Sequence, residues 1–229
     1  MLKRILKPLR VLSRQSAMAM TLRFHLSTHP MPAKIRESHE YLRQDFLDLS
    51  HHILSITDQK ELLAFLKENG HMLNDSLLAL VSSMIVERHI YLDEEFNEVA
   101  VPIICYYIGK MTRDHSPAFG AIMKNFALTE INSPVLWETI GQVYNSQRMY
   151  RYVLVQDLTD ITINFSLWQK PPMNFFELTV PVLIKHRLRI PDNKKEQLIQ
   201  GIERVGFTKE NLAQLNDTEV KGDNKHLIE

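Results

Sequence analysis

Two stretches of this 229-residue chain are nearly the same phrase, FNEVAVPII at 96–104 and FFELTVPVL at 175–183. A third stretch, LWETIGQVY at 136–144, lies between them. Aligning the three stretches places one glutamate of each at the same position: Glu98, Glu138 and Glu177. The spacings between these glutamates are 40 and 39 residues. A period in this range is typical of stacked helix pairs, in which each pair buries its apolar face against its neighbours.

Apolar residues elsewhere in the chain recur at spacings of three and four, which is the pattern of one helical face. Only seven glycines occur in the whole sequence, which disfavours a fold of strands and tight turns. Ser116-Pro117 and Ser133-Pro134 each predict a hydroxyl N-cap followed by a proline at the first helical position. The predicted helices are 36–54, 58–69, 75–88, 93–112, 117–129, 134–149, 153–169, 172–188, 192–205 and 208–215.

The period and the helices together predict an all-α fold, a right-handed stack of antiparallel helix pairs that repeats about every 39 residues. The recurring stretches fall in the second helix of each pair. Pro102 and Pro181 occupy equivalent positions inside those helices, where we expect each to bend its helix. The predicted parts of the chain are a transit peptide at 1–34, an N-terminal helix pair at 35–74, three helix-pair repeats at 75–190, capping helices at 191–215 and a flexible tail at 216–229.

The N-terminal segment has an unusual composition. Its first 34 residues contain seven Lys or Arg residues, several Ser and Thr, and no Asp or Glu. Short apolar stretches lie beside the charges, as they do in an amphipathic helix. This composition is typical of a mitochondrial transit peptide, and the alternative is a basic tail that binds nucleic acid or a membrane. We therefore expect the protein to be located in the mitochondrial matrix.

The remaining chain is acidic. Of 27 Lys and Arg residues, seven lie in the first 34 positions, whereas all 27 Asp and Glu residues follow, so residues 35–229 carry a net charge of −7. Such a chain attracts nucleic acid poorly as a whole, although a local basic surface is compatible with it. The longest apolar run, VAVPIICYYI at 99–108, has ten residues, whereas a membrane span needs about 20. Its Cys105 is the only cysteine, which excludes an internal disulfide and indicates a buried, inert thiol.

Basic residues recur with nearly the same period at the predicted ends of the second helices. The candidates are Lys110, Arg113, Arg148, Arg151, Arg187 and Arg189. In a stack they would form a column along one edge that could hold successive phosphates, with Tyr106, Tyr150 or Tyr152 available for base stacking. One alternative is that each cation complements a helix macrodipole, worth about 0.3–1 kcal/mol. Another is that the column binds an acidic protein.

No pattern in the sequence indicates catalysis or the binding of a metal ion or cofactor. His51 and His52 are adjacent, so on a helix they point about 100° apart rather than to one metal ion. We interpret the run RDHSP at 113–117 as a loop ending in a helix cap, and the aligned glutamates as structural. Trp137 and Trp168 are interpreted as packing residues between helices. We therefore predict a non-enzymatic protein with no catalytic, cofactor-binding or metal-binding residues and no small-molecule substrate.

Two segments resemble a known class of repeat: LLALVSSMIVERHIYLDEEFNEVAVPII at 77–104 and DITINFSLWQKPPMNFFELTVPVLI at 160–184. The first reads as an apolar helix, a short turn with an aromatic residue, and an acidic helix start, and the second is similar. They resemble the helical repeats of the FAST-kinase-like and heptatricopeptide families, which are mitochondrial and plastid proteins that act on organellar RNA. The resemblance covers about 75–190, without a RAP-like domain, and implies a role in mitochondrial RNA metabolism.

We therefore expect a non-enzymatic helical-repeat scaffold or adaptor that presents one face to the protein subunits of a large mitochondrial assembly, with no membrane span. The resemblance implies that this assembly is a ribonucleoprotein, such as the mitochondrial ribosome or an RNA-processing complex. Two alternatives stay open. One is a protein that binds single-stranded RNA directly, and the other is a matrix-side accessory subunit of a respiratory-chain complex.

Overall fold

The computed structural model describes residues 33–129, 131, 133–207 and 215, with side chains from residue 44 onward. Within these ranges every regular element is helical. The chain divides into one unit that ends at Asp45 and a second that starts at Phe46. Helix α2 (Ala33–Ser55) begins in the first unit and ends in the second. The predicted transit peptide lies outside the described residues except for its last two positions, and the predicted tail lies wholly outside them.

Further α-helices follow α2 in the second unit, and short 3-10 helices connect them in pairs. The α-helices are α3 (Gln59–Asn69), α4 (Asp75–Glu87), α5 (Glu94–Gly109), α6 (Ser116–Thr129), α7 (Pro134–Ser146), α8 (Val155–Ser166), α9 (Met173–Lys185) and α10 (Asp192–Arg204). The 3-10 helices are η1 (Gly70–Met72), η2 (Arg113–His115), η3 (Met149–Arg151) and η4 (Arg187–Arg189). Each 3-10 helix follows an odd-numbered α-helix and leads to the next even-numbered one.

The helix starts agree closely with the cap signals in the sequence. Ser133 Oγ accepts a hydrogen bond from Leu136 N at 3.4 Å, and Pro134 is the first residue of α7, as predicted. The prediction for Ser116 is wrong, because this residue already belongs to α6 and follows η2 directly. Thr112 takes the cap position before η2 instead. The helix predicted at 208–215 lies outside the described residues except for its last position.

Several helix ends differ from the prediction in the same way. Helices α5, α7 and α9 end at Gly109, Ser146 and Lys185, each three residues before the predicted end. The residues beyond these ends turn into the 3-10 connections rather than continuing the α-helix. Helical periodicity in a sequence does not distinguish a 3-10 turn from a last α-helical turn, because both repeat at about three residues.

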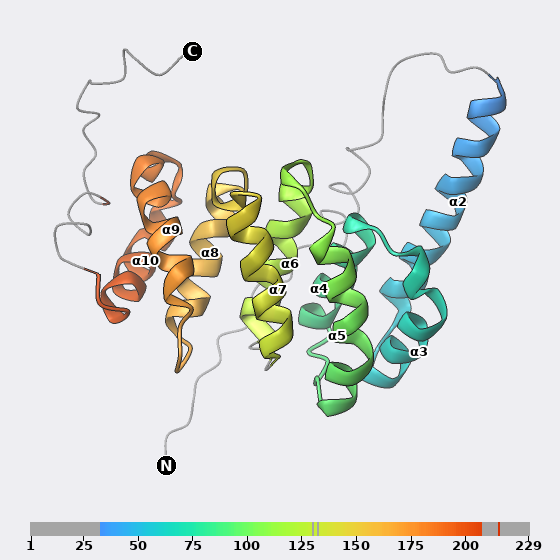
Figure 1. The fold of residues 1–229 in the computed structure, drawn as a ribbon, viewed down its shortest axis with the longest axis horizontal. Helices are drawn as coiled ribbons and strands as arrows, with labels where there is room; N and C mark the ends of the chain where they lie inside the picture. Colours follow the sequence, from blue (N-terminus) through green and yellow to red (C-terminus); the bar gives the residue numbers. More distant parts are fainter. Residues whose placement is uncertain (1–32, 130, 132, 208–214, 216–229) are drawn as a thin grey trace. The chain divides into compact units, whose positions relative to one another are not determined.

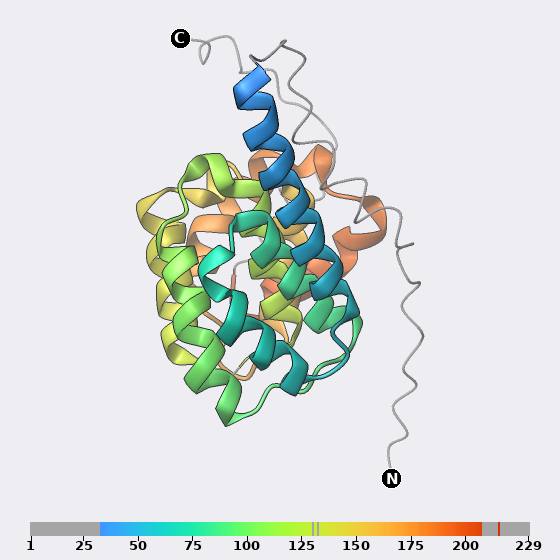
Figure 2. The ribbon, with the colours of Figure 1, turned by 90° about the vertical axis from the view of Figure 1, so that its right-hand side faces the viewer.

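The helices from α3 to α10 form two rows, and from α3 to α8 most helices pack against the helix two positions further along the chain. In one row α4 contacts α6, α6 contacts α8, and α8 contacts α10. In the other row α3 contacts α5 and α5 contacts α7, while α9 contacts α8 and η3. Figure 1 shows these helices side by side, and Figure 2 looks along the rows with α3 in front of the later helices. A single apolar core lies between the rows.

The three recurring sequence stretches have the same register in α5, α7 and α9. The third residue of each helix is buried: Phe96, Leu136 and Phe175. The fifth residue of each helix is an exposed glutamate: Glu98, Glu138 and Glu177. Two residues further along a helix the side chain points about 200° away, so burial of the third residue directs the fifth to solvent. Pro102 and Pro181 are each the ninth residue of a helix that continues through them.

Polar side chains fix the spacing of the even-numbered row. Asn125 of α6 donates from Nδ2 to the hydroxyls of Ser82 and Ser83 of α4, at 3.0 Å each. Helix α8 carries two carboxylates, one for each neighbouring helix. The resulting ion pairs are Lys124–Asp157 and Lys194–Asp160. These pairs are partly exposed, so each stabilises the fold by about 1 kcal/mol at most and mainly sets the register between helices.

Aromatic rings fill the space between α7, α8 and α9. The cluster contains Trp137, Tyr144, Phe165, Trp168 and Phe175. The ring centroids of Trp137 and Trp168 are 5.0 Å apart in an edge-to-face arrangement. Trp137 Nε1 donates to Ile131 O at 2.8 Å, and Trp168 Nε1 donates to Ala127 O at 3.2 Å. The prediction that both tryptophans pack between helices is confirmed.

Candidate binding edge

The connections that contain η2, η3 and η4 lie at the same end of the helices, along the upper edge in Figure 1. They do so because α5, α7 and α9 run in the same direction, which brings their C-terminal ends to one edge. The basic residues singled out in the sequence lie at these connections: Lys110, Arg113, Arg148, Arg151, Arg187 and Arg189. We call these six residues the basic edge.

The cations of the basic edge lie at or just beyond the C-caps of the α-helices. The last turns of α5 and α7 contain no basic residue. Lys110 is the C-cap of α5, Arg113 begins η2, and Arg148 directly precedes η3. The macrodipole effect falls off within the last turn, so it accounts less well for Arg113 and Arg148 than for Lys185, which is in the last turn of α9.

Most of the basic edge is accessible to solvent. Arg187 is half-buried, and the other five side chains are exposed. Arg113 Nε lies 4.0 Å from Asp114 Oδ1, and both side chains are largely exposed, so water screens their attraction. The exposed cations are therefore available to an anionic partner.

Tyrosines accompany the cations at two of the three connections. Lys110 Nζ lies 3.8 Å from the ring centroid of Tyr106 and also hydrogen-bonds to the Tyr106 hydroxyl. The Arg151 guanidinium carbon lies 5.7 Å from the ring centroid of Tyr150. These contacts orient the cations, and they cover one face of each of these rings. Tyr152 is 46% exposed. Of the three tyrosines considered for base stacking, it is the one with no such cation contact among the described residues.

Arg148 has a backbone conformation that side chains rarely adopt. Its φ of 53° and ψ of 41° place it in the left-handed region, directly after the C-cap of α7. His89 has a φ of 52° directly after the C-cap of α4, and Gly206 has a φ of 93° directly after the C-cap of α10. Glycine is the usual residue at this position because it has no Cβ. Arg148 therefore carries a backbone cost that a glycine would avoid.

The charge near the last connection depends on pH. Burial lowers the pKa of His186, and the neighbouring cations Arg189 and Lys185 lower this pKa further. His186 is therefore neutral at pH 7. At lower pH His186 takes up a proton and becomes positively charged. The cations of η4 repel this charge.

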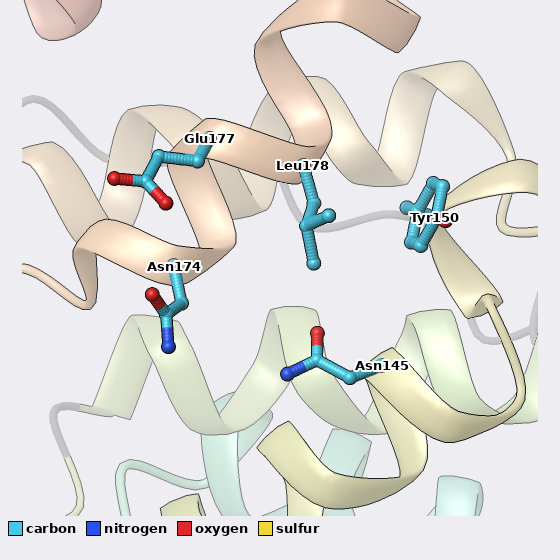
Figure 3. Close-up of a pocket in the computed structure, with 5 residues that line it drawn as sticks. All are labelled: Asn145, Tyr150, Asn174, Glu177 and Leu178. Atoms are coloured by element: carbon cyan, nitrogen blue, oxygen red, sulfur yellow. The ribbon is translucent and has the colours of Figure 1, made fainter.

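A surface depression lies between α7 and α9, with a volume of about 280 Å³. Its lining residues are Asn145, Tyr150, Asn174, Glu177 and Leu178. Figure 3 shows Leu178 directed toward Asn145 across the depression, with Asn174 and Glu177 at one end and Tyr150 at the other. Sequence analysis does not identify this depression, because its residues come from two helices and a connection and form no motif.

The other side chains considered in the sequence have structural surroundings. The run RDHSP forms η2 and the start of α6 rather than a loop, and His115 Nδ1 accepts a hydrogen bond from Thr112 N at 3.1 Å. Cys105 is half-buried, with its Sγ 4.0 Å from Val135 O. Among the described residues, no group of three or more His, Cys, Asp or Glu side chains could hold a metal ion. No described helix is both long enough and apolar enough to span a membrane.

Comparison with known proteins leaves the family open. No protein-family model matches the sequence, and no curated protein matches it. The functional argument therefore rests on the residues and their arrangement in the fold.

Proposed function

We propose that the second unit is an α-solenoid-like repeat, the right-handed stack of antiparallel helix pairs that the sequence period predicts. The equal register of α5, α7 and α9 supports this architecture, because the buried third residue and the exposed fifth residue recur in all three helices. The contacts between alternate helices support it as well, since each layer of a solenoid packs only against its neighbours. A 3-10 connection after each odd-numbered helix adds a third shared feature.

The function that this arrangement supports best is that of a non-enzymatic scaffold or adaptor subunit in a large mitochondrial assembly. The observation that carries the proposal is the basic edge, where exposed cations recur at three successive connections although residues 35–229 are acidic as a whole. The acid-free, basic N-terminal sequence supports a mitochondrial location. The resemblance to organellar RNA-acting repeats favours a ribonucleoprotein, such as the mitochondrial ribosome or an RNA-processing complex.

Charge reversal tests the role of the basic edge. The test variant changes Arg113, Arg148 and Arg189 to Glu. The control variant changes three exposed cations at the other ends of the helices: Lys60, Arg88 and Lys170. The two variants change the net charge equally, so only a local role of the basic edge separates them. Affinity purification from mitochondria should recover the partners with the wild type and the control but not with the test variant, and equal recovery with both variants contradicts the proposal.

Direct binding of single-stranded RNA is the second candidate, and the open ring of Tyr152 beside Arg151 favours it. Cations that contact phosphates release counterions, so each lost contact reduces the slope of log K against log salt by about 0.7 for a single strand. The purified wild type should then bind an oligouridine with a steeper salt dependence than the Arg113, Arg148 and Arg189 variant. The same slope for both proteins excludes RNA as the ligand of the basic edge.

A further inference from the structure

Bulky side chains pack between α7 and α9, the two helices that border the depression. The ring centroids of Tyr144 of α7 and Phe175 of α9 are 5.3 Å apart, and both rings are buried. The Tyr144 hydroxyl and the Thr179 hydroxyl of α9 are hydrogen-bonded at 2.5 Å. Burial raises the pKa of Tyr144, so its hydroxyl stays protonated and the bond persists at any physiological pH. These contacts fix α7 and α9, which border the depression, against each other.

The chemistry of the lining suits a peptide backbone. Asn145 and Asn174 each carry a carboxamide with an oxygen acceptor and an NH₂ donor, which complement the N–H and C=O of a peptide bond. Among the described residues, neither carboxamide has a hydrogen-bond partner in the protein. Leu178 lies across the depression from Asn145 and offers an apolar contact, as Figure 3 shows. The depression thus combines free polar groups with an apolar centre, as peptide-binding surfaces do.

The charges at the two ends of the depression are opposite in sign. Glu177 supplies an exposed carboxylate at one end. At the other end Tyr150 lies beside the guanidinium of Arg151, at 5.7 Å from the ring centroid. A ligand with a cation near Glu177 and no cation near Tyr150 complements this arrangement. A phosphate chain meets repulsion at Glu177, so the charges favour a peptide over RNA.

We propose that the depression between α7 and α9 binds an extended peptide segment of a partner protein, with a Lys or Arg side chain at Glu177 and an apolar side chain on Leu178. The carboxamides of Asn145 and Asn174 hydrogen-bond to the backbone of this segment. The proposal rests on the role of the chain as a scaffold, and it adds a second contact surface that is separate from most of the basic edge. A shallow, open surface of this size binds weakly by itself and contributes through its combination with other contacts.

Methyl NMR of the purified full-length chain tests the proposal with two defined probes. Both are acetylated and amidated hexapeptide pools, one of sequence Gly-Lys-X-X-X-Gly and one with Glu in place of Lys, where X is a mixture of apolar and neutral residues. The Leu178 methyl signals, assigned from a Leu178→Ile variant, should shift saturably with the Lys pool and stay unchanged with the Glu pool. An absence of saturable shifts with the Lys pool overturns the proposal.

Glu138 provides a matched control for Glu177, because each is the exposed fifth residue of its helix and Glu138 does not line the depression. Glu177→Gln should weaken binding of the Lys pool at least fivefold, whereas Glu138→Gln should change it less than twofold. The double variant Asn145→Ala, Asn174→Ala should also weaken binding at least fivefold while keeping the far-UV circular dichroism spectrum. Equal effects of the two glutamate variants overturn the proposal.

Two further outcomes separate this site from the proposed function. An octauridine that shifts the Leu178 signals while the Lys pool does not would assign the depression to RNA and overturn the peptide proposal. A purified chain that binds the Lys pool but recovers no mitochondrial partners retains the peptide site and loses the scaffold role. A chain that recovers mitochondrial partners but does not bind the Lys pool retains the scaffold role and loses the peptide site.

Discussion

Replacement of Arg148 by glycine should stabilise the fold and at the same time weaken partner binding. Arg148 has a φ of 53° directly after the end of α7, and the corresponding position after α10 is Gly206 with a φ of 93°. Glycine adopts this conformation without the clash between Cβ and the following carbonyl oxygen. The same substitution removes one exposed cation of the basic edge. Stability and binding should therefore change in opposite directions.

The expected gain in stability follows from two opposing terms. A left-handed conformation costs an L-residue about 1–2 kcal/mol. Glycine loses more backbone entropy on folding, which offsets about 0.5–1 kcal/mol of that gain. The free energy of unfolding should thus rise by about 0.5–1 kcal/mol, which corresponds to an increase in Tm of about 1–4 °C for a chain of this size.

His89→Gly is the matched control, because His89 has a φ of 52° after α4 and does not belong to the basic edge. Urea unfolding followed by circular dichroism at 222 nm should show a similar gain for both variants. Affinity purification from mitochondria should show reduced partner recovery for Arg148→Gly alone. A lower free energy of unfolding for Arg148→Gly, or an equal loss of recovery for His89→Gly, contradicts this prediction.

Further predictions concern the packing of the helices and the effect of pH. Asn97 Oδ1 is buried without a hydrogen-bond partner within the described structure, at the fourth position of α5, where α7 has Trp137 and α9 has Phe176. Asn97→Leu should raise the free energy of unfolding by about 1–2 kcal/mol in urea titrations, since it removes an unsatisfied acceptor, and a loss of stability contradicts this. A Cβ on Gly120 would lie 2.7 Å from Val153 Cγ1, whereas a Cβ on Gly141 would meet nothing within 4 Å. Gly120→Ala should therefore cost about 1–3 kcal/mol and Gly141→Ala should add up to about 1 kcal/mol, and equal effects of the two changes would show that Val153 does not lie this close to Gly120. The pKa of His186 is lower in the folded than in the unfolded protein, so folding favours the neutral imidazole. The resulting contribution to the free energy of unfolding is present above the unfolded pKa of about 6.5 and is lost as pH falls through the folded-state pKa. His186→Gln should flatten the pH dependence of Tm between about pH 7 and 5, and an unchanged profile would assign that dependence to other groups.

The sequence predicts the helices and their register well because these features depend on local chemistry. The Ser133-Pro134 pair defines the start of α7 by the same cap geometry that isolated helices use. The alignment of Glu98, Glu138 and Glu177 predicts an equal position in three helices, and each is the fifth residue of its helix. Helical periodicity is enough to place such residues on one face.

Features that depend on packing between helices are not visible in the sequence. Lys110 and Arg148 lie inside the predicted helices 93–112 and 134–149, but α5 and α7 end before them, because short-range periodicity does not separate a 3-10 turn from an α-helical turn. The depression depends on how α7 and α9 pack against each other through residues such as Tyr144 and Phe175, which no local pattern encodes. Its two asparagines therefore look like ordinary surface residues until the helices are assembled.

We propose that this chain is a scaffold subunit of a large mitochondrial ribonucleoprotein. Sucrose-gradient sedimentation of the tagged chain from mitochondrial lysate, with and without RNase, tests this proposal. The chain should sediment with a ribosome-sized or similarly large assembly and should move to lighter fractions after RNase treatment. Sedimentation as a free chain, or with a respiratory-chain complex that RNase leaves intact, contradicts it.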